Sequence, residues 1–139
     1  MAKRGKIKPL DKSSSSGKFS VQEPIDYNKQ PIIFSLERII SGNYCFSKLI
    51  PEDKKQFAET IFKRRTITWE DLYKTQRHGL GNEKISVSSI KQEKPKFITE
   101  EIKDYLAFRF NGKKAMVGIR QKNIFYVLWF DHDYTLYKH

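Results

Sequence analysis

Residues 105–137 read YLAFRFNGKKAMVGIRQKNIFYVLWFDHDYTLY, and this stretch decides the fold. It holds four runs rich in apolar and aromatic residues: Tyr105–Phe110, Ala115–Ile119, Ile124–Phe130 and Tyr134–Tyr137. The segments between the runs are short and rich in Asn, Asp, Gly and Lys, and Asn-Gly at 111–112 is among the strongest hairpin signals. The pattern predicts an antiparallel β-meander of four strands. Because Ile124–Phe130 is apolar on both faces, we expect it to be covered on both sides.

Helix signals precede the meander. Pro51-Glu52-Asp53 suits the first turn of a helix, and Lys63-Arg64-Arg65 places cations at its negative end. Thr68 is the expected N-cap of a second, short helix, and Thr99-Glu100-Glu101 favours a third of one or two turns. Ile32–Ile40 is typical of a further strand, and the region from Ile85 to Ile90 could form another.

The expected fold class is therefore α+β, with an antiparallel sheet that carries two or three helices on one face. The length of 139 residues suits one domain, which we place at 31–139. Residues 1–30 are rich in Lys, Ser and Gly, and we expect them to form a flexible basic tail.

Composition excludes several classes of protein. A mean hydropathy of -0.66 and the lack of a long apolar run exclude an integral membrane protein. The single cysteine, Cys45, excludes an intrachain disulfide framework and a multi-cysteine zinc site. It fits a reducing compartment, so we expect a cytoplasmic protein.

Charge is the strongest global signal. Lys and Arg number 27 against 16 Asp and Glu, which gives a formal net charge of +11. Such a charge attracts nucleic acid or an acidic protein partner. Residues 1–18 alone carry six cations and one carboxylate, so 6 − 1 = +5. Lys3, Arg4, Lys6 and Lys8 are candidate phosphate contacts, although the same tail could simply keep the protein soluble.

The sequence lacks the motifs of the common nucleotide-binding, metalloprotease and serine-hydrolase sites. We therefore expect no cofactor and no metal. The histidines are His78, His132 and His139. The segment Asp131-His132-Asp133 could supply a metal site or a general acid or base, but turn chemistry is favoured, because the same residue types are common in tight turns. The loop from Arg77 to Lys84 is either a binding loop or a solvated connection.

Arg109 and Arg120 lie in or at the end of predicted strands. Strand-borne arginines beside tyrosines make a basic, aromatic face that can hold phosphates and stack bases. Alternatively, their aliphatic stems cover the sheet.

The segment from Tyr105 to Arg120, followed by Ile124–Asp131, resembles the RelE/ParE-type toxin fold, in which an arginine-bearing strand precedes an apolar strand and an acidic turn. The resemblance implies a ribosome-dependent endoribonuclease or a gyrase poison that an antitoxin neutralises. The ending from Phe125 to Tyr137 also resembles a pattern in small uncharacterised prokaryotic and mobile-element proteins.

The leading hypothesis is a nucleic-acid-directed effector, an RNA-cleaving toxin that works without metal and whose partners are RNA or the ribosome and an acidic antitoxin. The alternative is a non-catalytic basic module, or a mobile-element inhibitor or adaptor, that docks nucleic acid or an acidic protein. The candidate catalytic residues are Arg109, Arg120, His78 and His132. The candidate nucleic-acid-binding residues are Lys3, Arg4, Lys6, Lys8, Arg77, Lys84, Tyr126 and Tyr134.

Overall fold

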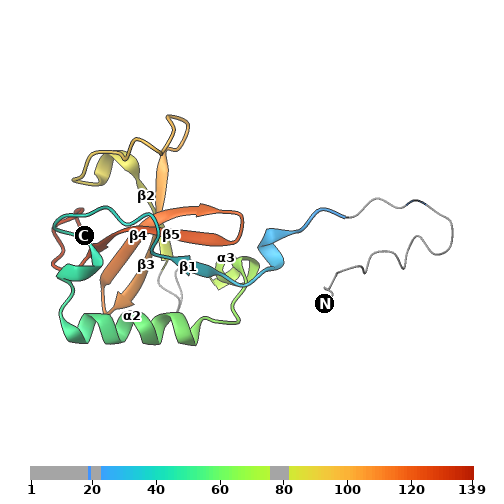
Figure 1. Cartoon of the computed structure of the whole chain (residues 1–139), viewed down its shortest axis with the longest axis horizontal. Helices are drawn as coiled ribbons and strands as arrows, with labels where there is room; N and C mark the ends of the chain where they lie inside the picture. The colour runs from blue at the N-terminus through green and yellow to red at the C-terminus, as the bar shows by residue number, and fades with distance from the viewer. Residues whose placement is uncertain (1–18, 20–22, 76–81) are drawn as a thin grey trace, which may run out of the picture.

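The protein is described by a computed structural model that covers residue 19 and residues 23–75 and 82–139. Its centre is a five-stranded sheet with the strand order β1-β5-β4-β3-β2 (Figure 1). The strands are β1 (Ile33–Ser35), β2 (Asn82–Ser86), β3 (Asp104–Asn111), β4 (Lys114–Gln121) and β5 (Ile124–Asp131). Neighbouring strands are antiparallel except β1, which runs parallel to β5. The α+β class is confirmed.

Two tight hairpins join β3, β4 and β5, as the sequence predicts. Each connection is a two-residue turn, and the first turn residue has a positive φ, +60° at Gly112 and +59° at Lys122. Glycine accepts such a conformation without steric penalty. Trp129 in β5 and Phe108 in β3 are fully buried, which confirms that this part of the chain supplies the core.

The prediction of a four-stranded meander is wrong in one detail, because Tyr134–Tyr137 is not a strand. Tyr134 has a φ of +63°, which is incompatible with an extended strand, and the Leu136 amide bonds to the Asp131 side chain instead of a neighbouring strand. The chain therefore folds back on itself after β5. The remaining places in the sheet are taken by β2 at one edge and β1 at the other.

In the part of the chain that the structure describes, two α-helices flank the sheet, α2 (Pro51–Lys63) and α3 (Trp69–Thr75). Pro51 is the first residue of α2, as predicted. The α3 cap is reciprocal: the Thr68 hydroxyl accepts from the Asp71 amide at 3.0 Å, and the Asp71 carboxylate accepts from the Thr68 amide at 3.2 Å. The third expected helix, near Thr99, is a turn.

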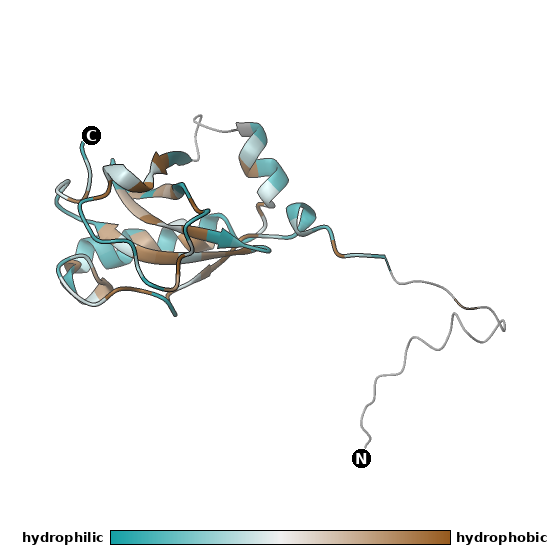
Figure 2. Cartoon of the chain, turned by 90° about the horizontal axis from the view of Figure 1, so that it is seen from above, coloured by the Kyte–Doolittle hydropathy of each residue, from teal (hydrophilic) through white to brown (hydrophobic). Residues whose placement is uncertain are grey.

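The helices cover one side of the sheet, which we call the helix face. Phe57 of α2 and Trp69 and Leu72 of α3 are buried there against side chains of the central strands. Figure 1 shows α2 running along this side, and Figure 2 shows that apolar residues are concentrated in the strands. The strand residues of this core are Phe108, Phe110, Met116, Phe125, Val127 and Phe130.

The opposite side, which we call the loop face, is covered by irregular chain instead of helices. Ile90 and Ile98 from the connection between β2 and β3 pack there, together with Leu136 and Tyr137 from the C-terminal segment. The strand residues of this second core are Ile85, Tyr105, Ala107, Ala115, Val117, Leu128 and Trp129. The expectation that β5 is covered on both sides is thus confirmed.

A buried ion pair fixes α2 to the β3–β4 hairpin. Asp53 in the first turn of α2 is 2% exposed, and its carboxylate accepts from Lys114 Nζ at 3.0 and 3.1 Å. Asn111 donates to the same carboxylate at 2.9 Å. A buried charge is tolerated when it is paired in this way, so the helix position is well defined.

Candidate functional site

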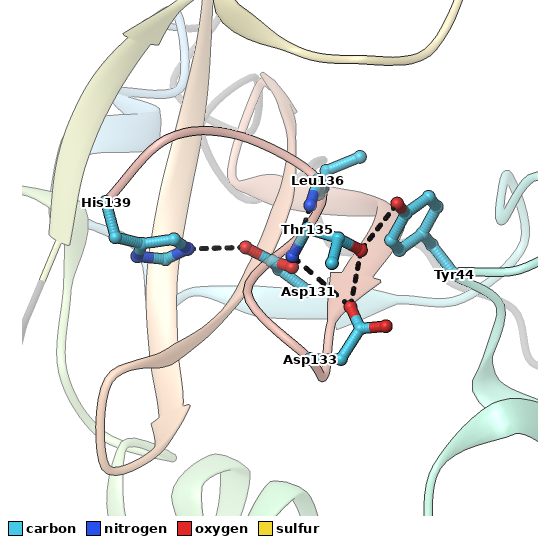
Figure 3. Close-up of polar contacts among 6 residues, drawn as sticks. All are labelled: Tyr44, Asp131, Asp133, Thr135, Leu136 and His139. Atoms are coloured by element: carbon cyan, nitrogen blue, oxygen red, sulfur yellow. Dashed lines mark hydrogen bonds and ion pairs between the residues drawn. The ribbon is translucent and has the colours of Figure 1, made fainter.

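A buried carboxylate lies where β5 ends. Asp131 is fully buried, and both of its oxygens are used (Figure 3). Oδ1 accepts from the Leu136 amide at 3.0 Å, and Oδ2 lies 2.5 Å from Nε2 of His139. Because a buried carboxylate is costly without partners, these two bonds hold the C-terminal segment against the sheet.

The contact with Asp131 defines the tautomer of His139. An ionised carboxylate can only accept hydrogen bonds, so Nε2 must carry the proton. In the neutral ring, Nδ1 therefore keeps its lone pair and is available to accept a proton. The ring is also fixed by two tyrosines: it stacks on Tyr137 with centroids 4.2 Å apart and meets Tyr134 edge-on at 5.1 Å.

A tight turn brings His139 back to Asp131. The Asp133 carboxylate accepts from the amide and from the hydroxyl of Thr135, at 3.3 and 2.6 Å. The bond from the Thr135 hydroxyl is the main reason why the pKa of Asp133 is lowered. Since the Thr135 hydroxyl donates to Asp133, the Tyr44 hydroxyl donates to Thr135, at 2.7 Å (Figure 3).

Strand register brings Arg109 into the same row as this pair. Arg109 lies opposite Ala115, and Ala115 lies opposite Asp131, so the three residues form one line across β3, β4 and β5. This line belongs to the loop face, where Ala115 is part of the core. The Arg109 side chain is exposed and makes no hydrogen bond or ion pair with another described residue.

Two residues of this row, Arg109 and Ala115, line a cleft of about 820 Å³. Its described lining includes Glu83, Arg109, Tyr137 and His139, together with the small residues Ala107 and Ala115. A volume of this size is typical of small-molecule sites. We refer to Arg109, Asp131, Tyr137 and His139 as the loop-face cluster.

Tyr137 reports the electrostatics of this cluster. Burial, and after it the carboxylates of Glu83 and Asp131, raise the pKa of its phenol to about 12, while Arg109 opposes them. The phenol is therefore protonated at neutral pH and can donate a hydrogen bond. The charges of Arg109, Glu83 and Asp131 thus all act on the Tyr137 phenol.

Arg120, the second predicted catalytic arginine, is occupied by other contacts. It also borders the cleft, but it pairs with Phe125, whose side chain belongs to the helix face. Its guanidinium lies 4.3 Å from the Trp69 ring centroid and donates to the Lys122 carbonyl, the Tyr73 hydroxyl and the Asn28 side chain. Arg120 thus ties α3 and the short 3-10 helix η1 (Tyr27–Lys29) to the sheet.

The other predicted residues are spread over the molecule. His132 donates to the Asn43 carbonyl at 2.9 Å, so its Nε2 is engaged in a tertiary contact away from the loop-face cluster. Lys84 is exposed on the edge strand β2, and Tyr126 is half-buried opposite Ser35 of β1. Tyr134 is 46% exposed beside His139. The remaining candidates, Lys3, Arg4, Lys6, Lys8, Arg77 and His78, lie outside the described residues.

Sequence reasoning named Asp131 only as part of the segment 131–133, missed Tyr137 as a site residue and did not select His139. One signal could have identified the pair: a carboxylate directly after a fully apolar strand is apt to be buried and needs a nearby donor. His139 follows eight residues later, but only the turn at Asp133 shows that it returns to Asp131.

Within residues 19, 23–75 and 82–139, no cluster of three or more His, Cys, Asp or Glu side chains could hold a metal ion. In the same part of the chain, no helix is both long and apolar enough to cross a membrane. No protein-family model, curated protein or solved structure gives a significant match to this chain.

Proposed function

We propose that this protein is an RNA-directed effector that cleaves the RNA backbone without a metal ion, using the loop-face cluster. The observation that carries the proposal is the alignment of Arg109 with the Asp131–His139 pair on one face of the sheet, beside a cleft. The net charge of +11 favours an anionic substrate.

Each member of the cluster has a role in the proposed reaction. Nδ1 of His139 takes the proton of a ribose 2′-hydroxyl, and Asp131 orients the ring and stabilises the imidazolium that forms. The 2′-oxygen then attacks phosphorus, and the bond from phosphorus to the 5′-oxygen breaks. The products are a 2′,3′-cyclic phosphate and a 5′-hydroxyl.

Arg109 stabilises the negative charge that builds up on the phosphate oxygens during this attack, and its lack of a described partner leaves its donors available. The departing 5′-oxygen takes its proton from water or from the ammonium group of Lys113 or Lys138, both of which line the cleft. The toxin–antitoxin assignment extends this proposal, with an acidic antitoxin as the inhibitory partner.

The test is a cleavage assay with the full chain on structured RNA and on ribosome-bound messenger RNA. We expect His139→Gln and Arg109→Ala each to lower kcat/KM by about 100-fold or more, which is typical for loss of an acid–base group or a charge stabiliser. Arg65→Ala removes an arginine at the end of α2, outside the cluster, and is the charge-matched control expected to retain the rate.

A substrate with a single 2′-deoxy nucleotide at the cleavage position provides a chemical control. It lacks the nucleophile, so the intact chain should bind it without cutting. Cleavage of the deoxy substrate, or no cleavage of any RNA by the intact chain, would contradict the proposal.

A non-catalytic binding module is the second candidate, and the net charge of +11 favours it independently of the cluster. Under this alternative, the chain binds RNA or an acidic protein, and the intact chain and its His139→Gln variant leave the RNA equally intact.

A further inference from the structure

An exposed tyrosine on α3 is held in a fixed orientation beside an arginine. Tyr73 is 42% exposed. Its hydroxyl accepts from the Arg120 guanidinium at 3.1 Å, and this guanidinium lies 5.8 Å from the Tyr73 ring centroid. Arg120 is itself held against Trp69, whose ring centroid is 4.3 Å away. The Tyr73 ring is thus accessible and already oriented, so a flat ligand can stack on it without the entropic cost of ordering this side chain.

A second tyrosine and two lysines lie on the neighbouring elements. Arg120 also donates to the Asn28 side chain at 2.7 Å, and this bond holds η1 beside the β4–β5 turn (Figure 1). In that turn, Lys122 Nζ lies 5.9 Å from the ring centroid of Tyr27. Lys29 at the end of η1 is exposed. We refer to Tyr27, Lys29, Tyr73, Arg120 and Lys122 as the α3–η1 surface.

The cations of this surface have no carboxylate partner among the described residues. The acceptors of Arg120 are a hydroxyl, a backbone carbonyl and a side-chain amide, and Lys29 and Lys122 form no ion pair. The carboxylates beside η1 and in α3 are already engaged with backbone amides or with a lysine of α3; they are Asp26, Glu70 and Asp71. The ammonium groups of Lys29 and Lys122 are therefore available to an external anion.

The α3–η1 surface is continuous with the cleft assigned above to RNA cleavage, because Tyr73 and Arg120 also line that cleft. Exposed aromatic rings beside cations suit single-stranded nucleic acid, in which each nucleotide offers a flat base for stacking and a phosphate for a cation. The bases of duplex RNA are already stacked on one another. An acidic peptide would satisfy the lysines but would bring no flat ring to Tyr73.

We propose that the α3–η1 surface binds single-stranded RNA where it extends from the cleft, with one base stacked on Tyr73 and phosphates on Lys122 and Lys29. The proposal rests on RNA as the substrate in the proposed function, and it adds a binding surface outside the loop-face cluster. In this arrangement Arg120 orients the Tyr73 ring, which explains why its own donors are used within the chain.

Fluorescence anisotropy with the full chain tests the stacking contact. The probe is a labelled single strand in which every ribose is 2′-O-methylated, so that it cannot be cleaved, and an abasic strand of the same length carries the same phosphates without bases. We expect Tyr73→Ala and Tyr73→Leu each to weaken binding of the base-containing strand by about 10-fold or more and to leave binding of the abasic strand unchanged. Tyr73→Phe keeps the ring and should retain the affinity for both strands.

Two matched variants serve as controls. Phe97 is 45% exposed and has the Arg38 guanidinium 5.2 Å from its ring centroid, but it does not line the cleft, so Phe97→Ala should bind both strands as the wild type does. Lys122→Gln should weaken binding of both strands and lower the slope of log K against log salt by about 0.7. Lys55→Gln removes an exposed lysine of α2 and should leave that slope unchanged.

The outcomes separate this proposal from the proposed function. If the Tyr73→Ala and Tyr73→Leu variants bind the base-containing strand as the wild type does, or lose affinity equally for the abasic strand, the stacking role is wrong while RNA cleavage stands on its own assay. If binding depends on Tyr73 but no RNA is cleaved, the surface stands and the catalytic proposal fails. Displacement of the RNA strand by a polyglutamate peptide of equal charge at an equal concentration would assign the surface to an acidic protein and overturn the proposal.

Discussion

Tyr137 couples the loop-face cluster to the stability of the fold at high pH. Its pKa is raised from 10 to about 12, chiefly by burial and then by the nearby carboxylates of Glu83 and Asp131. The folded protein therefore holds this proton more tightly than the unfolded chain. The resulting stabilisation is fully present below pH 10 and is lost as the pH rises from 10 to about 12.

We expect Tyr137→Phe to reduce this loss of stability at high pH. In urea unfolding at increasing pH, the free energy of unfolding of the wild type should fall by roughly 2 kcal/mol more than that of the variant between pH 10 and pH 12. Tyrosinate absorbance should also show one late-ionising tyrosine fewer in the variant. Parallel stability curves for the two proteins would show that Tyr137 ionises as freely in the folded state as in the unfolded one.

The candidate site could be predicted only in part at the residue level. Arg109 was identified because a charged residue inside an apolar strand is conspicuous in a sequence. His139 was not selected, because its role depends on the burial of Asp131 and on the turn that starts at Asp133. Arg120 shows the opposite failure: its residue type suits phosphate binding, but its neighbours Trp69 and Tyr73 already engage it. Such contacts are set by tertiary structure, which local patterns do not encode.

At the level of elements, β4 and β5 approach each other unusually closely at Gly118. The register between the two strands shifts between Val117 and Gly118, so Leu128 on β5 is the extra residue of a bulge. A Cβ atom built on Gly118 would lie 1.9 Å from the backbone oxygen of Tyr126. No rotation of a side chain can relieve that contact, because both atoms belong to or adjoin the main chain.

Gly118→Ala should therefore force the two strands apart. We expect it to lower the free energy of unfolding by about 3 kcal/mol, at the upper end of typical overpacking costs. Gly112→Ala is the comparison, because it has open space around it but a φ of +60°. That change should cost about 1 kcal/mol through backbone strain alone. Urea denaturation of both variants tests this order, and equal losses would mean that β5 adjusts freely around the bulge.

The elements with strong local signals were predicted well, and those defined by distant partners were not. The hairpins from β3 to β5 have tight turns, and α2 and α3 have recognisable first turns. By contrast, the strand predicted over Ile32–Ile40 is too long: β1 keeps only Ile33–Ser35, which pair in parallel with β5, about ninety residues away along the chain. The predicted strand at Tyr134–Tyr137 fails because Asp131 takes the amide of Leu136 that a strand would share with its neighbour. Leu136 and Tyr137 of this segment are nonetheless buried, because they pack against the loop face of the sheet.

At the scale of the whole molecule, the two faces of the sheet differ: one is a closed core, and the other carries the candidate site. The helix face is a closed aromatic core in which α2 and α3 cover the strands. The loop face is covered by irregular chain. A cleft, an exposed arginine and a buried carboxylate that is paired with His139 occur together on this face. Irregular segments can place polar side chains at positions that a helix cannot reach, which explains why the candidate site lies on this face.

The net positive charge of the whole chain favours binding to a polyanion. At +11, the protein should bind single-stranded RNA at low salt, and its affinity should fall steeply as the salt concentration rises, since each phosphate contact releases counterions. Residues 1–18 carry +5 of this charge, so their removal leaves +6 on residues 19–139. If all six cations of residues 1–18 contact phosphates, the slope of log K against log salt should shrink by up to about 4.

Filter binding over a salt series measures that slope for the full chain and for a chain that lacks residues 1–18. A third protein, in which the six cations of residues 1–18 are replaced by Gln, keeps the length and separates charge from chain length. We expect the truncated and the neutralised proteins to share the same reduced slope, because both lack the six cations whose phosphate contacts release counterions. A neutralised protein that keeps the full slope would place the phosphate contacts entirely on residues 19–139. Cleavage provides the complementary readout: loss of residues 1–18 should raise KM and spare kcat, whereas Arg109→Ala should lower kcat, because only Arg109 is proposed to contact the reacting phosphate.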